Sequence, residues 1–384
     1  MGTTDHFAGY LGRRTPEDHV LAIGRFVALL LAICLMAGCA TPVVPSPSAS
    51  ESPSASASAS VPPPLEGDVI AFHSDPGGRD DFYEIRADGT GVRQITDGAE
   101  TVAFPYWSPD GSRIAYVCCS RGEPAVWVMN ADGSNPIQLT DAPSGEPTWS
   151  ADGAEIAYAS YADESIWLVR PDGTQRRPLS QQGAGPTWSP DSGRIAFFSR
   201  RDFPGKDQRN ELYIVNEDGT GEIRLTNDTA EDILPDWSPD SSRLAWIRTV
   251  DGTPHVFVMN ADGSHVRQLT DGPDVDDAAD WSPDGSRILF VRYLDGADPL
   301  TLGQGNAEIF TVSADGGEEV NLTRNEQWDG YPAWSPDGLQ IAYGVNDGQQ
   351  FNLMLMDADG TNVRALPGAP AAVTANDCCP AWRP

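Results

Sequence analysis

A tryptophan motif recurs seven times in this chain of 384 residues and constrains its fold more than any other feature. Most copies read Pro-x-Trp-Ser-Pro-Asp-Gly or a close variant, and successive tryptophans lie between 39 residues (149 to 188) and 53 residues (281 to 334) apart. Self-similarity at a period of this size is the signature of a repeat architecture. The seven tryptophans are Trp107, Trp149, Trp188, Trp237, Trp281, Trp334 and Trp382.

Each tryptophan begins a unit of four short strands, which we call A to D. In the unit that starts at Pro235, the tryptophan strand is followed by a Ser-Pro-Asp turn, the segments RLAWI and HVFVMN, an Asp-Gly turn and the segment VRQLT. Short β-branched and aromatic runs with turn residues between them are typical of an all-β repeat fold. Four strands in a unit of about 40–50 residues predict a β-propeller blade.

The two ends of the repeat region complete each other. Residues 67–96 supply strands B, C and D without an A strand, and residues 378–384 supply an A strand alone. We expect the two fragments to form one composite blade, which closes the ring and covers both open sheet edges. Six complete units and this composite predict seven four-stranded blades.

Residues 1–39 have the features of an export signal. Arg13, Arg14 and Arg25 precede an apolar run over residues 26–37, which is too short to span a bilayer. The ending Leu-Met-Ala-Gly-Cys39 resembles a bacterial lipobox, and this resemblance implies cleavage before Cys39 and attachment of a lipid to it. The alternatives are a plain secretory signal or an uncleaved anchor.

Residues 40–64 are rich in Ser, Ala and Pro and have no apolar periodicity. Such a segment buries too little apolar surface to offset its ordering entropy, so we expect a disordered tether. The predicted domains are therefore the signal (1–39), the tether (40–64) and the propeller (65–384). We then expect the chain to be exported and held on the outer face of the bacterial cell membrane by its lipid, with a periplasmic or extracellular location as the alternative.

The net charge of −31, from 56 acidic and 25 basic residues, restricts the partners. Nucleic acids and anionic lipid headgroups require basic patches, so we expect no nucleic acid and contact with the membrane only through the lipid. We expect a monomer whose partner is an envelope protein or polymer.

The repeat pattern WSPDG, IAF, IYVMNADG and RQLT resembles the TolB-like Pro-Asp variant of WD-type repeats, over residues 67–384. The resemblance implies a β-propeller in which the tryptophans and both turns are structural. Members of this family act as interaction modules in bacterial envelopes, form lids of serine peptidases or have no assigned role. The TolB propeller itself commonly has six blades and an added N-terminal domain, and this chain departs from that pattern.

The loops on one face of the predicted propeller are the candidate binding surface. The A-to-B and C-to-D turns are uniform and share one face, whereas the B-to-C and D-to-A loops share the other. Two long insertions, over residues 200–210 and 293–306, fall in B-to-C loops. Length variation confined to one face favours binding at that face.

Acidic residues precede four consecutive tryptophans by five positions, at Asp232, Asp276, Asp329 and Asp377, with Glu231 and Asp277 beside them. We expect these carboxylates to meet on one arc of the channel mouth. Oxygen ligands of this kind suit Ca²⁺, another hard cation or a cationic ligand group. The alternative is that each aspartate accepts hydrogen bonds from backbone amides of its own loop. Trp328 and Tyr331 lie in the same region and are candidate exposed contacts.

Four cysteines form two vicinal pairs in the predicted propeller, Cys118 with Cys119 and Cys378 with Cys379. Both pairs fall on the loop face of neighbouring blades, and an exported protein permits disulfides. We expect one or two cross-links between the pairs, which would fix the closing strand. Vicinal disulfides and a thiolate metal site are the alternatives.

Signatures of catalysis are missing from the sequence. It has neither a Gly-x-Ser-x-Gly elbow nor a His-Glu-x-x-His motif, and we assign no catalytic residue. The sequence therefore favours a binding module. The alternatives are a propeller lyase or hydrolase that uses the acidic residues at the channel mouth, with or without a metal, and a purely structural envelope protein.

Overall fold

The computed structural model describes residues 65–74, 81–96, 102–120, 123–141, 143–202, 209–297, 299, 304–348, 350–366 and 378–384. The predicted signal, lipid site and tether (1–64) lie outside the described residues, and so does Asp377. Within the described part of the chain, no helix has the length and apolar character needed to cross a membrane.

The described residues form 28 strands and no helix. In chain order they are β1 (Val69–Ser74), β2 (Asp81–Arg86), β3 (Arg93–Gln94), β4 (Val102–Trp107), β5 (Arg113–Ser120), β6 (Glu123–Asn130), β7 (Ile137–Gln138), β8 (Ser144–Trp149), β9 (Ile156–Ser160), β10 (Ser165–Val169), β11 (Arg177–Ser180), β12 (Ala184–Trp188), β13 (Arg194–Ser199), β14 (Glu211–Asn216), β15 (Ile223–Arg224), β16 (Asp232–Trp237), β17 (Arg243–Val250), β18 (Thr253–Asn260), β19 (Arg267–Gln268), β20 (Val275–Trp281), β21 (Arg287–Leu294), β22 (Asn306–Ser313), β23 (Val320–Asn321), β24 (Trp328–Trp334), β25 (Gln340–Asn346), β26 (Phe351–Asp357), β27 (Arg364–Ala365) and β28 (Cys378–Trp382).

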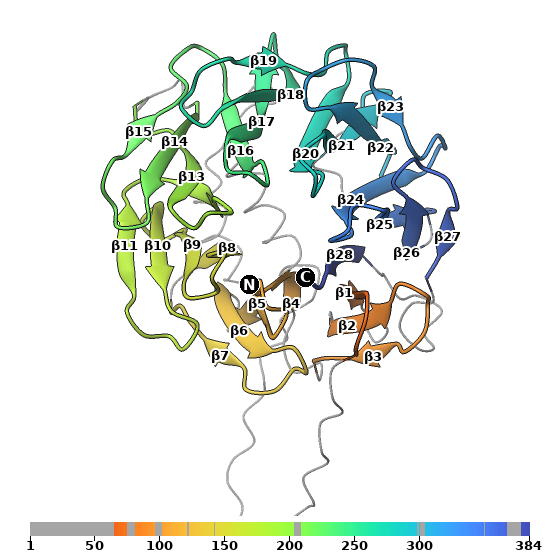
Figure 1. Ribbon diagram of the computed structural model, residues 1–384, viewed down its shortest axis with the longest axis horizontal. Helices are drawn as coiled ribbons and strands as arrows, with labels where there is room; N and C mark the ends of the chain where they lie inside the picture. The colour runs from red at the N-terminus through yellow and green to blue at the C-terminus, as the bar shows by residue number, and fades with distance from the viewer. Residues whose placement is uncertain are drawn as a thin grey trace, which may run out of the picture.

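The strands form four-stranded antiparallel sheets, as the sequence predicts. Five sheets have four strands each, and β20–β27 form two further groups of four joined by a single parallel bridge between Ala307 and Trp328. The sheets are arranged around a common axis, with the tryptophan strand of each group nearest the centre and its two- to four-residue last strand at the rim (Figure 1). This architecture confirms the predicted all-β class with four-stranded antiparallel sheets.

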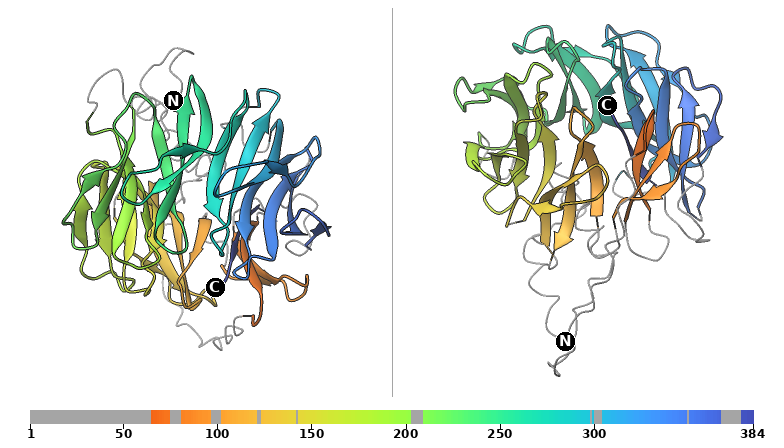
Figure 2. Two further views of the ribbon diagram at one scale, coloured as in Figure 1. Left: turned by 45° about the horizontal axis from the view of Figure 1, so that its top comes forward. Right: turned by 60° about the horizontal axis from the view of Figure 1, so that its bottom comes forward.

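The strands run between two faces of the molecule (Figure 2). We call the face with the A-to-B and C-to-D turns the turn face, and the opposite face the loop face. The turn face is built by one repeated contact, in which a serine after the tryptophan donates its hydroxyl proton to an aspartate two residues later. Ser108 and Asp110 (2.6 Å) and Ser238 and Asp240 (2.6 Å) are examples. The repeated Ser-Pro-Asp sequence therefore fixes the turn geometry.

The C-terminal strand β28 pairs with the N-terminal strand β1, so the two ends of the repeat region share one sheet. Ile70 lies opposite Trp382 in this pair, and Ala71 lies opposite Ala381. The backbone N–H of Arg383 extends the pairing to the carbonyl of Val69 at 2.9 Å. We call the sheet β28-β1-β2-β3 the composite unit.

Every inner strand contains a β-bulge three residues before its tryptophan. In β4, for example, the register shifts between Ala103 and Tyr106, so that two residues lie opposite one residue of β5. A bulge bends the strand and re-aims the side chain at that position. The seven bulged residues all have positive φ, between 52° and 57°, and are Phe104, Glu146, Gly185, Leu234, Ala278, Tyr331 and Cys379.

Candidate binding site around the inner strands

The repeat tryptophans join neighbouring units. The indole N–H of Trp149 donates to the carbonyl of Tyr106 in the preceding unit at 3.0 Å, and that of Trp237 donates to Thr187 at 3.1 Å. All seven rings are buried, with exposures from 4% to 8%. Five of the seven indoles make such a bond, whereas the buried N–H groups of Trp188 and Trp334 have no partner in the described structure. A buried ring that also makes a hydrogen bond fixes the spacing of two units, so these residues help to hold the scaffold.

Asp232 is buried inside its own unit. Its carboxylate accepts hydrogen bonds from Nε (2.6 Å) and Nη2 (2.7 Å) of Arg248 and from the indole of Trp246 (2.7 Å). Arg248 lies directly opposite Asp232 in the register of β16 and β17. The partner of the carboxylate is therefore an arginine on the next strand, and not the loop amides considered from the sequence.

Asp276 occupies the equivalent place in β20 and makes a larger network. Arg292 Nε donates to its Oδ1 at 2.6 Å, while Arg292 Nη2 (3.1 Å) and Thr270 Oγ1 (2.6 Å) donate to Oδ2. His255 Nδ1 lies 3.3 Å from the same oxygen. The network leaves Asp276 with no exposed surface.

Asp329 differs from these two because the residue opposite it in β25 is Val345. Asn325 Nδ2 donates to Oδ2 of Asp329 at 2.6 Å, but Oδ1 is buried with no hydrogen-bond partner in the described structure. Burial raises the pKa of Asp329 to about 6, and the charge of Glu308 acts in the same direction.

These contacts correct the expectation of an exposed acidic arc, because Asp232, Asp276 and Asp329 have no exposed surface. Among the described residues, no group of three or more His, Cys, Asp or Glu side chains is arranged to hold a metal ion. Glu231 and Asp277 are half-buried; Asn210 Nδ2 donates to Glu231 at 3.1 Å. The geometry gives no support to a Ca²⁺ site at these aspartates.

The prediction that Trp328 is an exposed contact is also wrong, since its side chain is only 2% exposed. It packs in a cluster with Val291 and Ala307 of the preceding unit. The half-buried ring of Tyr331 packs edge-on against it, with centroids 5.3 Å apart. Trp328 is thus a core residue between two units, and Tyr331 remains as the partly exposed aromatic.

At the bulged position of the inner strands, each unit contributes a different side chain. The seven residues include two aromatic rings, a carboxyl, a thiol and three small or aliphatic side chains. Two adjacent bulges are joined directly, since the N–H of Gly185 donates to Glu146 Oε2 at 2.6 Å. The repeat therefore holds a set of unlike side chains at one level around the central axis.

Three carboxyls of the inner strands were not singled out by the sequence analysis. Glu146 occupies a bulge, while Asp236 and Asp280 directly precede repeat tryptophans of neighbouring units. The N–H of Trp281 approaches Asp236 Oδ2 at 3.3 Å. The sequence feature that could have identified Asp236 and Asp280 is an acidic residue directly before a repeat tryptophan, which occurs only in these two adjacent units.

Burial raises the pKa of all three inner carboxyls. The pKa of Glu146 rises to about 7 despite the hydrogen bond from Gly185, and that of Asp236 rises to about 6. The pKa of Asp280 is raised well above its usual value by burial and by the charge of Asp236. The inner strands that carry these three carboxyls therefore lose negative charge as the pH falls below neutrality.

Stability is expected to pass through a maximum at mildly acidic pH. The inner carboxyls and Asp329 bind more protons in the folded chain than in the unfolded chain, so their contribution grows as the pH falls from about 7 to about 5. The turn aspartates behave oppositely, because serine hydroxyls lower the pKa of Asp110 and Asp240 to about 2. Their contribution is lost below the unfolded pKa of about 4. Urea midpoints measured from pH 8 to pH 2 test this, and a steady decline from pH 8 downward would contradict it.

The two cysteine pairs lie on strands of neighbouring units, β5 and β28. Cys118 is on β5 opposite Val102, and Cys379 is the bulged residue of β28; both are buried. The indole of Trp107 donates to the carbonyl of Ala381 at 3.1 Å, which brings β28 against β4. The side chains of Cys119 and Cys378 are outside the described part, so the cross-link stays a prediction.

The chain matches the family profile of the TolB beta propeller domain (PD40) over two overlapping stretches, residues 50–184 and 113–384. These stretches cover the whole repeat region. The chain belongs to the TolB beta propeller domain family. The resemblance seen in the sequence motifs is thereby confirmed.

Individual relatives cover smaller parts of the chain. The TolB homologue of Chlorobium luteolum is 33% identical over 116 residues, which are 30% of this chain and 27% of that protein. This chain thus matches little more than a quarter of that relative's length.

Two solved structures share the fold. TolB from Acinetobacter baumannii has a TM-score of 0.52 at 20% identity, covering 79% of each chain. An oligogalacturonate lyase from Vibrio parahaemolyticus has a TM-score of 0.58 at 16% identity, covering 80% of this chain and 88% of its own. Identities this low establish the β-propeller fold alone.

Proposed function

We propose that this TolB-type propeller is a binding module that recognises an envelope protein or polymer at its loop face. The observation that carries the proposal is the ring of bulged residues. The scaffold repeats its tryptophans and turns nearly unchanged, while the bulged position presents a different side chain in every unit. Five of these residues are at least partly exposed, and a repeat fold that varies one position on a constant frame is suited to recognition.

The scaffold of this module is a complete ring of seven blades, which the composite unit closes. The contacts at the closing junction repeat those found elsewhere, which supports this arrangement. Trp382 donates its indole N–H to Ala333 at 3.0 Å, just as other repeat tryptophans bond the preceding unit. Arg364 donates to the carbonyl of Ala87 at 2.8 Å, matching the bond from Arg177 to Glu217 (3.0 Å).

The module is exported and held at the outer face of the membrane by a lipid on Cys39. The tether of residues 40–64 would reach about 75 Å when extended at about 3.1 Å per residue. The parent protein should then incorporate a labelled fatty acid, and Cys39→Ser should not. A parent protein that takes up no label would remove the lipid from the proposal and leave the binding face untouched.

The binding proposal is tested by replacing two bulged aromatics. After chemical cross-linking in cells, the full-length protein should recover a specific partner that the double variant Phe104→Ala with Tyr331→Ala recovers at least tenfold less, because truncated aromatic contacts typically cost about 2 kcal/mol or more. The control is Leu339→Ala with Val363→Ala, two exposed apolar residues of the turn face. Equal recovery by both double variants would refute recognition at the loop face.

A further inference from the structure

The repeat region is entered at Leu65, and hydrogen bonds fix its first residues on the turn face. The backbone N–H of Leu65 donates to Glu84 at 2.8 Å, and its carbonyl accepts from Nη1 of Arg383 at 2.9 Å. The carbonyl of Glu66 accepts from Nε of Arg86 at 3.1 Å. These bonds hold the start of the propeller against its own composite unit.

The strand order explains why the entry point is on the turn face. The first strand, β1, is a B strand, and the B strands of the complete units begin at the A-to-B turn and end at the loop face. The carbonyl of Val69, at the start of β1, accepts from the N–H of Arg383, which directly follows β28. Leu65 also lies beside Gly91 in the C-to-D turn of the same unit. Both ends of the repeat region therefore lie at the turn face.

The predicted tether, residues 40–64, thus joins the propeller on the side opposite to the loop face. A flexible chain of 25 residues has a root-mean-square end-to-end distance of about 25–30 Å. The strands that separate the two faces reach eight residues, as in β17, or about 26 Å at about 3.3 Å per residue. A tether that ran past these strands to bring the loop face to the membrane would need most of its typical length for that path alone.

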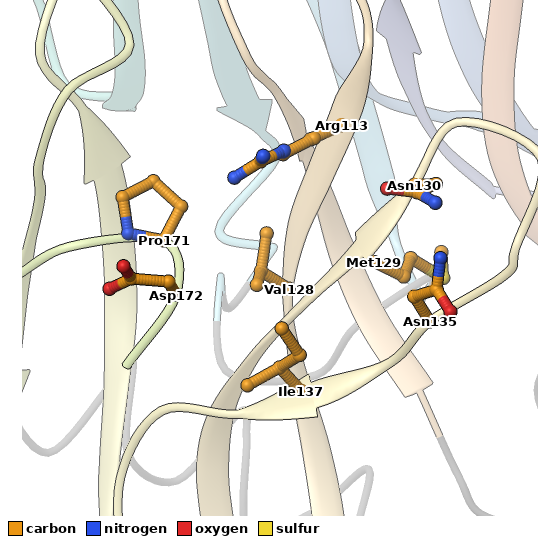
Figure 3. Close-up of a pocket in the computed structure, with 8 residues that line it drawn as sticks. All are labelled: Arg113, Val128, Met129, Asn130, Asn135, Ile137, Pro171 and Asp172. Carbon is orange, nitrogen blue, oxygen red and sulfur yellow. The ribbon is translucent and has the colours of Figure 1, made fainter. Parts of the chain in front are cut away.

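The surface charge gives neither face an affinity for anionic lipid. On the turn face, the Thr174 hydroxyl lowers the pKa of Asp172, so this carboxylate stays ionised at neutral pH. Figure 3 shows Asp172, Arg113 and Ile137 lining one hollow between two units, so the apolar side chain there lies among charged groups. The loop face carries exposed carboxylates as well, such as Asp271. Because the whole chain has a net charge of −31, the point of attachment decides the orientation.

We propose that the lipid-anchored protein stands with its turn face toward the membrane and its loop face away from it. This inference rests on the lipid attachment proposed above and narrows the choice of partner. The ring of bulged residues then meets a component of the envelope that lies beyond the membrane surface, and not the headgroups or the embedded proteins of that membrane. The extended length of the tether, about 75 Å, limits how far away such a component can lie.

Energy transfer in vesicles measures which face lies nearer the membrane. The full-length lipidated protein would be reconstituted in vesicles of phosphatidylethanolamine and phosphatidylglycerol that contain an acceptor dye on a lipid headgroup. A fluorescent amino acid would replace the exposed Ser242 or Ser286 on the turn face, or the exposed Asp271 or Glu326 on the loop face. We expect transfer at least about twofold more efficient from the turn face, because a strand length of about 26 Å separates the two levels.

A shorter tether should make the difference between the faces larger. A chain that lacks residues 45–59 keeps ten residues of the tether, with a root-mean-square length of about 16–19 Å. The matched control replaces residues 45–59 by an equal number of Gly and Ser residues and should behave like the parent.

Two results would overturn the orientation. Equal transfer from both faces at both tether lengths, or stronger transfer from the loop face, would do so and leave recognition at the loop face intact. Transfer from neither face would overturn the lipid attachment together with the orientation.

Discussion

A chain that lacks residues 378–384 is expected to fail to fold as a soluble monomer. The deletion removes β28, leaving the buried strand β1 (Val69–Ser74) as an open edge. It also removes the ring of Trp382 and the carbonyl that accepts the indole N–H of Trp107. Loss of a single buried tryptophan costs about 3–5 kcal/mol, and a whole domain is stable by only about 5–15 kcal/mol. An exposed apolar edge in addition favours aggregation.

Size-exclusion chromatography and urea denaturation measure this effect, and Trp382→Ala provides a graded version. We expect Trp382→Ala to lose about 3–5 kcal/mol of unfolding free energy. Val363→Ala, at a half-exposed position, should change stability by less than about 0.5 kcal/mol. A deletion variant that elutes as a monomer with the parent's urea midpoint would show that β28 does not close the fold.

Asparagine substitution is expected to have opposite effects at two equivalent aspartates. Asp276→Asn removes one of the two carboxylates paired with Arg292, a side chain only 10% exposed that keeps Glu319 as a partner, and should cost about 1.5–3 kcal/mol. Asp329→Asn removes a buried carboxylate that faces no arginine and whose pKa is raised to about 6. At pH 8 this carboxyl is ionised although its buried environment favours the protonated form. Asp329→Asn should therefore raise the free energy of unfolding by about 1–3 kcal/mol.

Denaturation of both variants at pH 8 and pH 5 separates charge from packing. The gain of Asp329→Asn should shrink at pH 5, where the parent carboxyl is protonated when folded. The loss of Asp276→Asn should persist at both pH values. Destabilisation of similar size in the two variants would contradict the distinction between a paired and an unpaired carboxylate.

Much of the fold follows from local sequence patterns. The four-stranded units, the Ser-Pro-Asp turns and the pairing of the two chain ends are all specified by short motifs at fixed spacing. Trp382, for example, lacks the Ser-Pro-Asp turn that follows other repeat tryptophans, yet the structure pairs its strand with β1 as expected. Repeats constrain one another, so an incomplete unit at each end has one plausible completion.

The candidate site is harder to predict from the sequence, because it depends on which side chains lie opposite one another on neighbouring strands. Asp232 and Asp276 share a sequence position with Asp329, but their environments are set by Arg248 and Arg292 on the next strand, 16 residues later. The β-bulge is equally hidden, since no common residue type marks it. Its seven residues share only their position in the strand register and a positive backbone φ.

The most direct test of recognition at the ring of bulged residues is site-specific photo-cross-linking in living cells. A photoreactive residue would replace Leu234, Ala278 or Tyr331 on three neighbouring inner strands, and matched controls would replace Ser112, Ser242 or Ser286 on the turn face. The account predicts adducts of one common mass from the bulged positions and none of that mass from the controls. Adducts of equal yield from both sets, or from the turn face alone, would contradict it.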